Sequence, residues 1–380
     1  MAGIYIHVPF CKQACHYCDF HFSTVLKQKA NYLAALHTEI RLQKEYLGKQ
    51  TIDTIYFGGG TPSLLLPEEL EGIFAALHAH FNISSDAEIT LEANPDDLLK
   101  EKISFLKSSP VNRLSIGIQS FRKEDLTWMN RAHTVQQASD SIKFAQDQGI
   151  GNISIDLIYG LPELDGEAWR GNLHRAFELD VQHISAYCLT VEPRTALAGF
   201  IKSGKTAVPG EDVSSGHFRI LREEMQWNGF KHYEISNFGK PEYFSKHNSN
   251  YWKGVHYLGL GPSAHSFNGI SRQWNVANTP LYIRNLLKSE MTFEQETLTP
   301  EQRYNEYVMT SLRTMWGTDL MYIRETFGVD AETHCTTESE FYLHSGKLIR
   351  MGHALVLTEE GMLIADRIAS DLFMTGLSNA

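Results

Sequence analysis

The sequence predicts an α/β protein: a partial (β/α)6 barrel followed by a smaller, mostly helical C-terminal domain. Over the first 190 residues, short apolar runs alternate with longer amphipathic runs, a pattern typical of parallel strands joined by right-handed helical crossovers. Polar and Gly-rich residues follow several of the apolar runs, as they do at the catalytic mouth of a parallel barrel. After Thr190 the alternation stops, so the rest of the chain lies outside the repeat.

The elements of the predicted barrel alternate along the chain. Short apolar runs indicate strands at Gly3–Val8, Thr51–Phe57, Glu88–Ala93, Asn112–Ile118, Asn152–Ile158 and His183–Leu189. Apolar residues spaced three and four apart indicate helices at Ala30–Tyr46, Pro67–His80, Lys100–Ser108, Val135–Gln148 and Glu167–Leu179. Periodicity alone does not separate a closed barrel from an open sheet.

The second half of the chain has a different pattern. We expect a helix near Asp212–Asn228, a short strand around Lys231–Ile235, and an aromatic, His-rich segment over residues 238–274. From about Pro300 the pattern is helical, and the turn at Leu355–Gly361 after those helices is similar to that of a winged-helix domain. The expected parts are therefore a barrel over residues 1–235, a connecting segment over 236–295 and a C-terminal domain over 296–380.

Composition excludes several classes of function. The 380 residues are 42% hydrophobic and 21% charged, as in a soluble protein with a large core. The net charge of −11 argues against a nucleic-acid partner, which normally needs a basic face. The sequence has no apolar run long enough to span a membrane and no signal-peptide pattern at its start. We therefore expect a cytoplasmic protein whose thiols stay reduced.

The cysteines predict a metal centre. The chain has five, an odd number, and Cys11, Cys15 and Cys18 lie within eight residues of each other, which does not look like a disulfide framework. A C-x-x-x-C-x-x-C loop can bind three irons of a 4Fe–4S cluster. The fourth iron can then take the amino and carboxylate groups of S-adenosylmethionine (SAM). The alternative is zinc, which needs a fourth ligand such as His16 or His21.

Six further stretches extend the pattern across most of the chain. They read GIYIHVPFC, YFGGGTPSLL, EITLEANPD, RLSIGIQSF, NRAHT and SIDLIYGLP. Together with the cysteine loop, they resemble the radical SAM family, in the branch that contains anaerobic coproporphyrinogen III dehydrogenase and its heme-chaperone relatives. The resemblance implies a SAM pocket at the barrel mouth and a 4Fe–4S cluster on the three cysteines.

The resemblance also assigns the residues of the SAM pocket. The glycine run can approach a ligand closely and offer N–H groups to an anion, and the family match implies that Gly59, Gly60 and Thr61 contact the methionine moiety. Further implied contacts are Glu92 to the amine, Gln119 and Asp156 to the ribose, Arg131 to the carboxylate, Tyr5 and Tyr17 beside SAM and the cluster, and, more loosely, Thr190 to the adenine. Cys188 and Cys335 are expected to be ordinary buried thiols.

Three features favour the chaperone relatives over the dehydrogenase. The dehydrogenase carries a further cysteine where this chain has Phe20, and it has an extension before the cluster, whereas this chain begins ten residues before Cys11. His247 opens an HNxxYW motif associated with the chaperones, and imidazole is a common heme ligand. The apolar rings of Tyr251 and Trp252 can line a porphyrin. The sequence leaves two other nearby ligands open, His256 and His265.

The resemblance thus implies a heme chaperone that binds heme and passes it to acceptor proteins, expected to be respiratory ones at the inner face of the membrane. It also implies an electron donor for the cluster and leaves a homodimer open. In one alternative SAM cleavage drives or gates heme transfer, and in the other the cluster and SAM are structural or regulatory. The competing class is a radical SAM enzyme, either a coproporphyrinogen III decarboxylase or one with an unrelated substrate.

Overall fold

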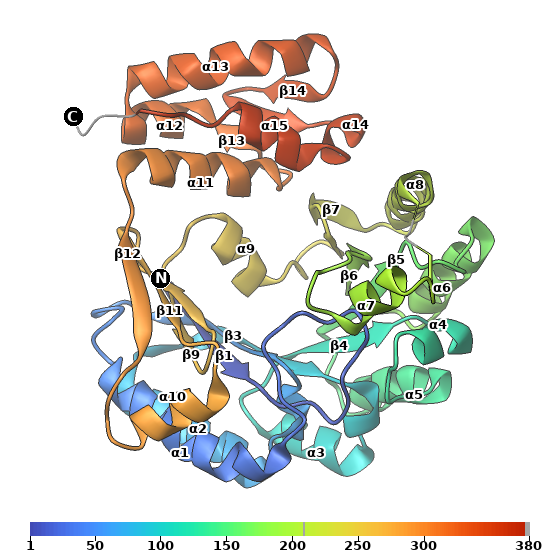
Figure 1. Ribbon diagram of the computed structural model, residues 1–380, viewed down its shortest axis with the longest axis vertical. Helices are drawn as coiled ribbons and strands as arrows, with labels where there is room; N and C mark the ends of the chain where they lie inside the picture. The colour runs from blue at the N-terminus through green and yellow to red at the C-terminus, as the bar shows by residue number, and fades with distance from the viewer. Residues whose placement is uncertain (208–209, 377–380) are drawn as a thin grey trace.

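A computed structural model describes residues 1–207 and 210–376, and its central feature is an open sheet (Figure 1). Six parallel strands follow one another in chain order. These strands are β1 (Ala2–Val8), β2 (Ile52–Gly59), β3 (Ile83–Ala93), β4 (Arg113–Gln119), β5 (Ile153–Tyr159) and β6 (His183–Cys188). The predicted series of six parallel strands is confirmed, and the sheet does not close into a barrel.

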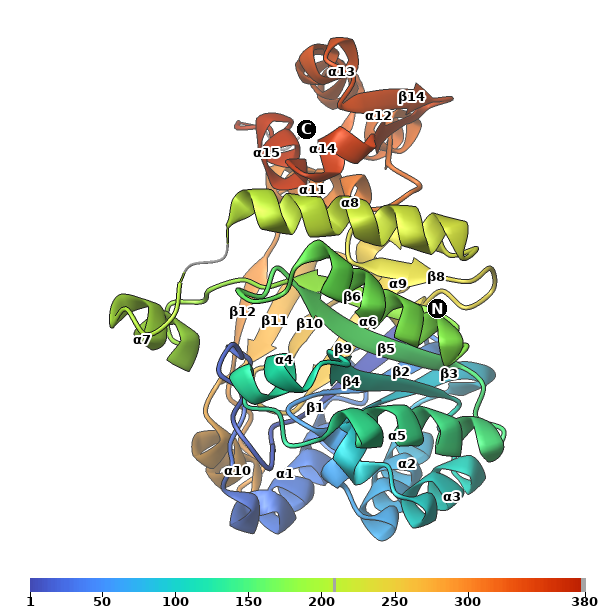
Figure 2. The ribbon, with the colours of Figure 1, turned by 90° about the vertical axis from the view of Figure 1, so that its right-hand side faces the viewer.

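Helices cover the outer face of these strands, as Figures 1 and 2 show. They are α1 (Lys29–Leu42), α2 (Pro67–His80), α3 (Lys100–Ser108), α4 (Lys123–Trp128), α5 (Val135–Asp147), α6 (Gly166–Glu178) and α8 (Glu211–Trp227). The helix α7 (Ala196–Lys202) stands apart from the strands in Figure 2 and contacts the cysteine loop, where Leu197 N–H donates to His16 O (2.8 Å). The prediction placed the end of the first helix too late, because the chain leaves helical geometry after Leu42 and turns at Gly48, where φ is 59°. The helices α4 and α7 were not predicted, because they are too short to show a clear helical period of apolar residues.

The strands present a polar face to the inside of the half-barrel. Successive side chains of a strand point to opposite faces, and on β1 the buried Ile4, Ile6 and Val8 face the helices. The residues that alternate with these point into the lumen, and the pairing of neighbouring strands places them in two rows across the sheet. One row is Tyr5, Tyr56, Thr90 and Arg113, and the other is Glu92, Ser115, Ser154 and His183. This lumen therefore holds hydrogen-bonding and charged groups rather than an apolar core.

The chain from Lys231 to Thr297, which contains the predicted strand at Lys231–Ile235 and the predicted connecting segment, continues the sheet on both edges. Its elements are β7 (Lys231–Glu234), β8 (Asn237–Gly239), α9 (Lys246–Trp252), β9 (Tyr257–Leu260), β10 (His265–Phe267), β11 (Ser271–Asn275), α10 (Thr279–Leu286) and β12 (Phe293–Thr297). Strands β7 and β8 extend the sheet beyond β6, whereas β9 pairs in parallel with β1 and leads to β10, β11 and β12. Short, partly polar strands of this kind show little alternation of apolar and polar residues, so the strands β8–β12 were not predicted.

The C-terminal part is a separate group of elements in Figure 2, and it has its own hydrophobic core. It consists of α11 (Pro300–Leu312), β13 (Thr318–Asp319), α12 (Leu320–Phe327), α13 (Val329–His344), β14 (Leu348–Met351), β15 (Ala354–Leu357), α14 (Glu359–Met362) and α15 (Ala365–Asp371). Its three strands form an antiparallel sheet. Backbone hydrogen bonds join it to the barrel, from Ile235 N–H to Arg313 O (3.0 Å) and from Met315 N–H to Tyr233 O (3.0 Å). Residues 377–380 of the expected domain lie outside the described part.

No helix in the described ranges combines the length and the apolar character that crossing a membrane requires.

Candidate functional site

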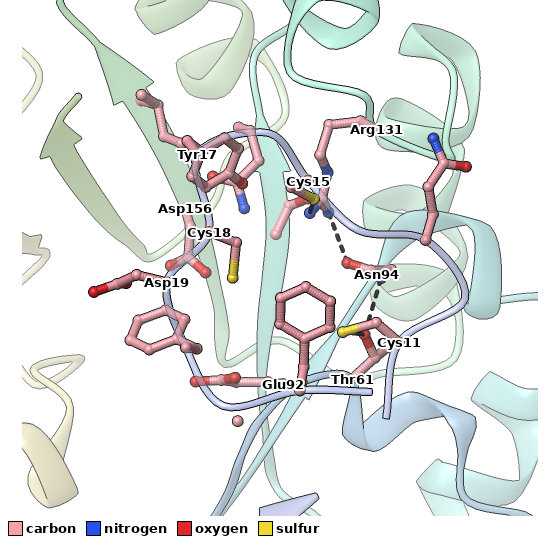
Figure 3. Close-up of a pocket in the computed structure, with 18 of the residues that line it drawn as sticks. Cys11, Cys15, Tyr17, Cys18, Asp19, Thr61, Glu92, Asn94, Arg131 and Asp156 are labelled. Carbon is pink, nitrogen blue, oxygen red and sulfur yellow. Dashed lines mark hydrogen bonds between the residues drawn. The ribbon is translucent and has the colours of Figure 1, made fainter. Parts of the chain in front are cut away.

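A cavity of about 450 Å³ lies at the carboxyl ends of the barrel strands (Figure 3). The cysteine loop covers one side of it, and the strand ends form the other. It brings together most of the residues that the sequence assigned to cluster and SAM: Cys11, Cys15, Tyr17, Cys18, Gly59, Gly60, Thr61, Glu92, Gln119, Arg131, Asp156 and Thr190. Tyr5 and His247 are not among the lining residues. The volume lies in the range of sites for small cofactors.

The cysteine loop is fixed to the barrel at both ends. Cys11 N–H donates to Ser23 O (3.1 Å), and Ser23 N–H donates to Pro9 O (2.8 Å), so the two ends of the loop pair with each other. Farther along, His16 N–H donates to Met129 O (3.1 Å). These backbone bonds hold the loop over the cavity.

The three thiols of the loop suit a cluster better than zinc. All three are free and partly exposed, and burial together with the neighbouring thiols raises the pKa of Cys18 to about 12. No three His, Cys, Asp or Glu side chains in residues 1–207 and 210–376 are arranged to share a single ion. His16 Nδ1 bonds to Trp128 O (2.8 Å) and His21 Nε2 to Thr279 Oγ1 (2.9 Å). One thiolate for each of three irons fits this loop.

The glycine run allows the end of β2 to pass close to β1 and the cysteine loop. A Cβ on Gly59, whose φ is +110°, would lie 2.6 Å from His7 Nδ1, and a Cβ on Gly60 would lie 2.7 Å from Phe10 O. Gly60 N–H donates to Val8 O (2.9 Å). The close approach is therefore to the protein itself, and the Gly60 amide is not the free anion-binding donor that the sequence suggested.

Two carboxyl groups face the cavity from β3 and β5. Burial, followed by the charge of Asp156, raises the pKa of Glu92 to about 7, and burial raises the pKa of Asp156 to about 6. Tyr56 donates its hydroxyl to Glu92 Oε1 (2.8 Å), and Ser115 donates to Asp156 Oδ1 (3.5 Å). Asp156 lies inside β5 rather than at its end. Paired carboxylates with raised pKa values favour a cationic ligand.

The guanidinium of Arg131 lies beside the cysteine loop and is held by three hydrogen bonds. Its Nη1 donates to Cys15 Sγ (3.4 Å), and its Nη2 donates to Asn94 Oδ1 (2.6 Å) and to Gly117 O (2.8 Å). The sequence assigned this guanidinium to the SAM carboxylate. In the structure it has three protein acceptors, one of them the thiol of Cys15, and its contact with the SAM carboxylate stays a prediction.

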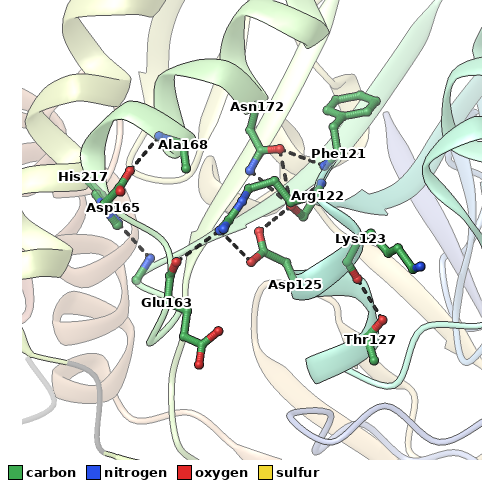
Figure 4. Close-up of polar contacts among 12 residues, drawn as sticks. Phe121, Arg122, Lys123, Asp125, Thr127, Glu163, Asp165, Ala168, Asn172 and His217 are labelled. Carbon is green, nitrogen blue, oxygen red and sulfur yellow. Dashed lines mark hydrogen bonds and ion pairs between the residues drawn. The ribbon is translucent and has the colours of Figure 1, made fainter.

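A second polar network holds the chain between β4 and Arg131 (Figure 4). Asn172, 1% exposed on α6, accepts from Phe121 N–H (2.8 Å). Ser120 donates to Asp125 Oδ2 (2.6 Å), and Arg122 pairs with Asp125 Oδ1 (2.9 Å). This buried network fixes the turn after Gln119, whose own φ is 66°.

Tyr5 and His247 meet inside the lumen, away from the lining of the cavity. His247 Nδ1 bonds to Thr54 Oγ1 (2.9 Å), and its ring stacks on Tyr56 at 5.1 Å and lies 6.5 Å from Tyr5. Thr54 pairs with Gly3 near the amino end of β1, whereas Cys11 follows the carboxyl end. His247 thus lies toward the opposite end of the strands from the cysteines.

Two polar residues of this region, Asn94 and Arg113, were not predicted as site residues. Asn94 lines the cavity and contacts Thr61 and Arg131. Arg113 is 1% exposed in the lumen, and its charge lowers the pKa of both Glu92 and Asp156. Polar residues alternate with apolar ones in EITLEANPD and RLSIGIQSF. Parallel strands covered on both faces are normally apolar throughout, so this alternation could have indicated that one face of these strands lines a polar site.

The two cysteines outside the loop differ from each other. Cys335 is buried in the C-terminal core, as expected. Cys188 is exposed and lines the cavity at the end of β6, so its prediction as a buried thiol was wrong. The strand ends there, and its last two residues leave the core.

A half-barrel with a three-cysteine loop above a polar cavity defines a radical SAM protein, and comparisons with known proteins agree. The model of the Radical SAM superfamily matches residues 5–175, and that of the HemN C-terminal domain matches residues 298–364. Heme chaperone HemW of Bacillus subtilis is 33% identical over 371 residues, 97% of this chain and 98% of that protein. The Escherichia coli HemW is 36% identical over 266 residues, 69% of each chain.

The chain therefore belongs to the HemW family within the radical SAM superfamily. Among solved structures, coproporphyrinogen III oxidase (HemN) of Escherichia coli superimposes with a TM-score of 0.85 at 23% identity, over 98% of this chain and 90% of that one. At that identity the likeness establishes a shared fold only.

Proposed function

We propose that this protein is a heme chaperone of the HemW type, which binds heme and passes it to acceptor proteins. The observation that carries the proposal is the match to HemW proteins over almost the whole length of both chains. The proposed acceptors are respiratory proteins at the inner face of the membrane, and the cluster takes its electron from an external donor. The absence of a further cysteine at Phe20, which is 69% exposed at the cavity, supports the chaperone over the decarboxylase.

His247 has the chemistry of a heme ligand. Burial, with the charge of Arg113, lowers its pKa to about 3, so the imidazole is neutral, and neutral imidazole is the form that binds iron. Thr54 occupies Nδ1, and Nε2 has no hydrogen-bond partner in the described part of the chain. Tyr251, one helical turn later, is 44% exposed and offers an aromatic face. These residues would hold the heme, whose iron supplies the coordination site.

The cavity residues are suited to the cluster and SAM. When bound, the cluster supplies an electron for reductive cleavage of SAM. Cys11, Cys15 and Cys18 would hold the irons, Glu92 would hold the amine of SAM, and Asp156 would hold its ribose. Arg131 and Thr61 donate hydrogen bonds to the cysteine sulfurs. The cavity and His247 lie toward opposite ends of the strands, so the proposal does not require SAM and heme to compete for one site.

A heme titration of the reconstituted protein, followed by Soret absorbance with and without SAM, tests the proposal. We expect saturable binding at micromolar heme and at least about tenfold weaker binding in His247→Ala, because the imidazole that would hold the heme iron is removed. The matched control is His353→Ala, which removes an exposed imidazole of the C-terminal part. An unchanged Soret band in His247→Ala removes this residue as the ligand, and no binding at micromolar heme overturns the function.

A further inference from the structure

A continuous chain of hydrogen bonds joins two of the cluster cysteines through one side chain, that of Asn94. Thr61 donates its hydroxyl to Cys11 Sγ (3.4 Å), and Asn94 Nδ2 donates to Thr61 Oγ1 (3.3 Å). On the other side, Arg131 donates to Asn94 Oδ1 (2.6 Å) and to Cys15 Sγ (3.4 Å). Figure 3 shows Asn94 between Thr61 and Arg131, beside the cysteine loop.

The direction of every bond in this chain follows from Arg131. A guanidinium can only donate, so the oxygen of the Asn94 amide must face Arg131 and its NH2 must face Thr61. The Thr61 oxygen then accepts from Asn94, which leaves the Thr61 proton to point at Cys11. A reversed amide would place NH2 against the guanidinium and would turn the threonine proton away from the sulfur.

The side chain of Asn94 is not explained by a local structural role. Asn94 precedes a short 3-10 helix at Pro95–Asp97, and asparagine in this position commonly caps a helix with its side chain. Here the side chain makes no capping bond. Backbone fixation comes from Ser63, whose hydroxyl accepts Asn94 N–H (3.2 Å). The side-chain amide is therefore free to bind Thr61 and Arg131, the two residues that donate to the cysteine sulfurs.

We propose that Asn94 is a positioning residue that sets the reduction potential of the cluster. It does so by aiming the Thr61 hydroxyl at the Cys11 sulfur and by holding Arg131 against the Cys15 sulfur. Hydrogen bonds to cluster sulfurs stabilise the more negative, reduced cluster and so raise its potential. The proposal rests on the cluster site described above, but it does not depend on heme.

The decisive variant is Asn94→Asp, which keeps the shape of the side chain but removes its donor. Arg131 keeps its acceptor, whereas Thr61 must turn its proton to the new carboxylate and so releases Cys11. The lost hydrogen bond and the added negative charge both disfavour the reduced cluster. We expect the reduction equilibrium to fall at least about tenfold, a shift of about 59 mV to more negative potential for a one-electron couple.

The test is an anaerobic redox titration of the reconstituted full-length protein, followed by electron paramagnetic resonance, with iron content measured in parallel. Thr61→Val removes the same donor without touching Asn94 and should shift the potential in the same direction, whereas Thr61→Ser keeps the hydroxyl and should restore it. A wild-type potential in either Asn94→Asp or Thr61→Val overturns the proposal. If Asn94→Asp does not retain the cluster, Thr61→Val decides. Heme binding, measured separately, reports on the proposed function alone.

Discussion

Glu92 offers a quantitative test of the cavity, because its charge depends on pH in the physiological range. Burial raises its pKa to about 7 in the ligand-free protein. A cationic ligand binds the ionised carboxylate better, so the affinity for SAM should rise as pH rises through about 7. The ionised fraction goes from about one in eleven at pH 6 to about ten in eleven at pH 8, a change of about tenfold, or about 1.4 kcal/mol.

The perturbation is Glu92→Gln, which keeps the hydrogen-bonding shape but cannot ionise. Loss of a charge-assisted contact should weaken SAM binding at pH 8 by about tenfold or more. At pH 6 the wild-type carboxyl is mostly protonated, so the two proteins should bind almost alike. The ratio of their dissociation constants should therefore fall about tenfold from pH 8 to pH 6. Titration of SAM itself cancels in this ratio.

The assay is anaerobic calorimetric titration of the cluster-loaded protein with SAM at several pH values. Glu68→Gln, an exposed position on α2, is the matched control and should follow the wild type throughout. A ratio that stays constant across pH, or Glu92→Gln binding like wild type at pH 8, would show that Glu92 does not face the cationic part of SAM.

Three further changes probe the surroundings of the site. Arg113→Met removes a charge that lowers the pKa of Glu92, so the midpoint of the wild-type SAM profile should move above pH 7; an unmoved midpoint contradicts this. Cys18→Ser should lose the visible absorbance of the cluster, whereas Cys335→Ser, buried in the C-terminal core, should keep it. Glu39 is 1% exposed and accepts from Gly261 N–H (2.8 Å), Asn275 Nδ2 (2.5 Å) and Tyr282 Oη (2.5 Å). Glu39→Ala should lower the free energy of unfolding by about 3 kcal/mol in anaerobic urea titrations, because three donors lose their acceptor. A loss no larger than that of the exposed Glu45→Ala would show that these hydrogen bonds do not stabilise the fold.

The cluster side of the site was predictable because its signals are local. Three cysteines within one short loop and polar residues directly after apolar runs are visible in the sequence, and the parallel topology places such strand ends together. Glu92 and Gln119 end such runs, whereas Arg131 was expected at the cavity only because the family resemblance implied it. The helix bounds of α2 and α3 were predictable for the same reason, since each has a clear period.

Other features depend on contacts between distant segments. The sequence placed His247 only within an aromatic, His-rich segment. It lies on α9, whose first N–H groups donate to Glu88 of β3 (3.1 Å each). The pairing of β9 with β1 joins residues more than 250 positions apart. Asn94 was visible only as part of a strand-end motif, because its role requires Arg131 and Thr61 to meet across the cavity.

The most direct test of the chaperone against the decarboxylase is one anaerobic incubation. The reconstituted protein is mixed with coproporphyrinogen III, SAM and a strong reductant, and the porphyrins are oxidised and separated by chromatography. We predict that coproporphyrinogen III is recovered unchanged, since the chain has Phe20 where the dehydrogenase carries a cysteine. Accumulation of protoporphyrinogen with time and protein concentration would contradict the account and identify the protein as an enzyme of heme synthesis.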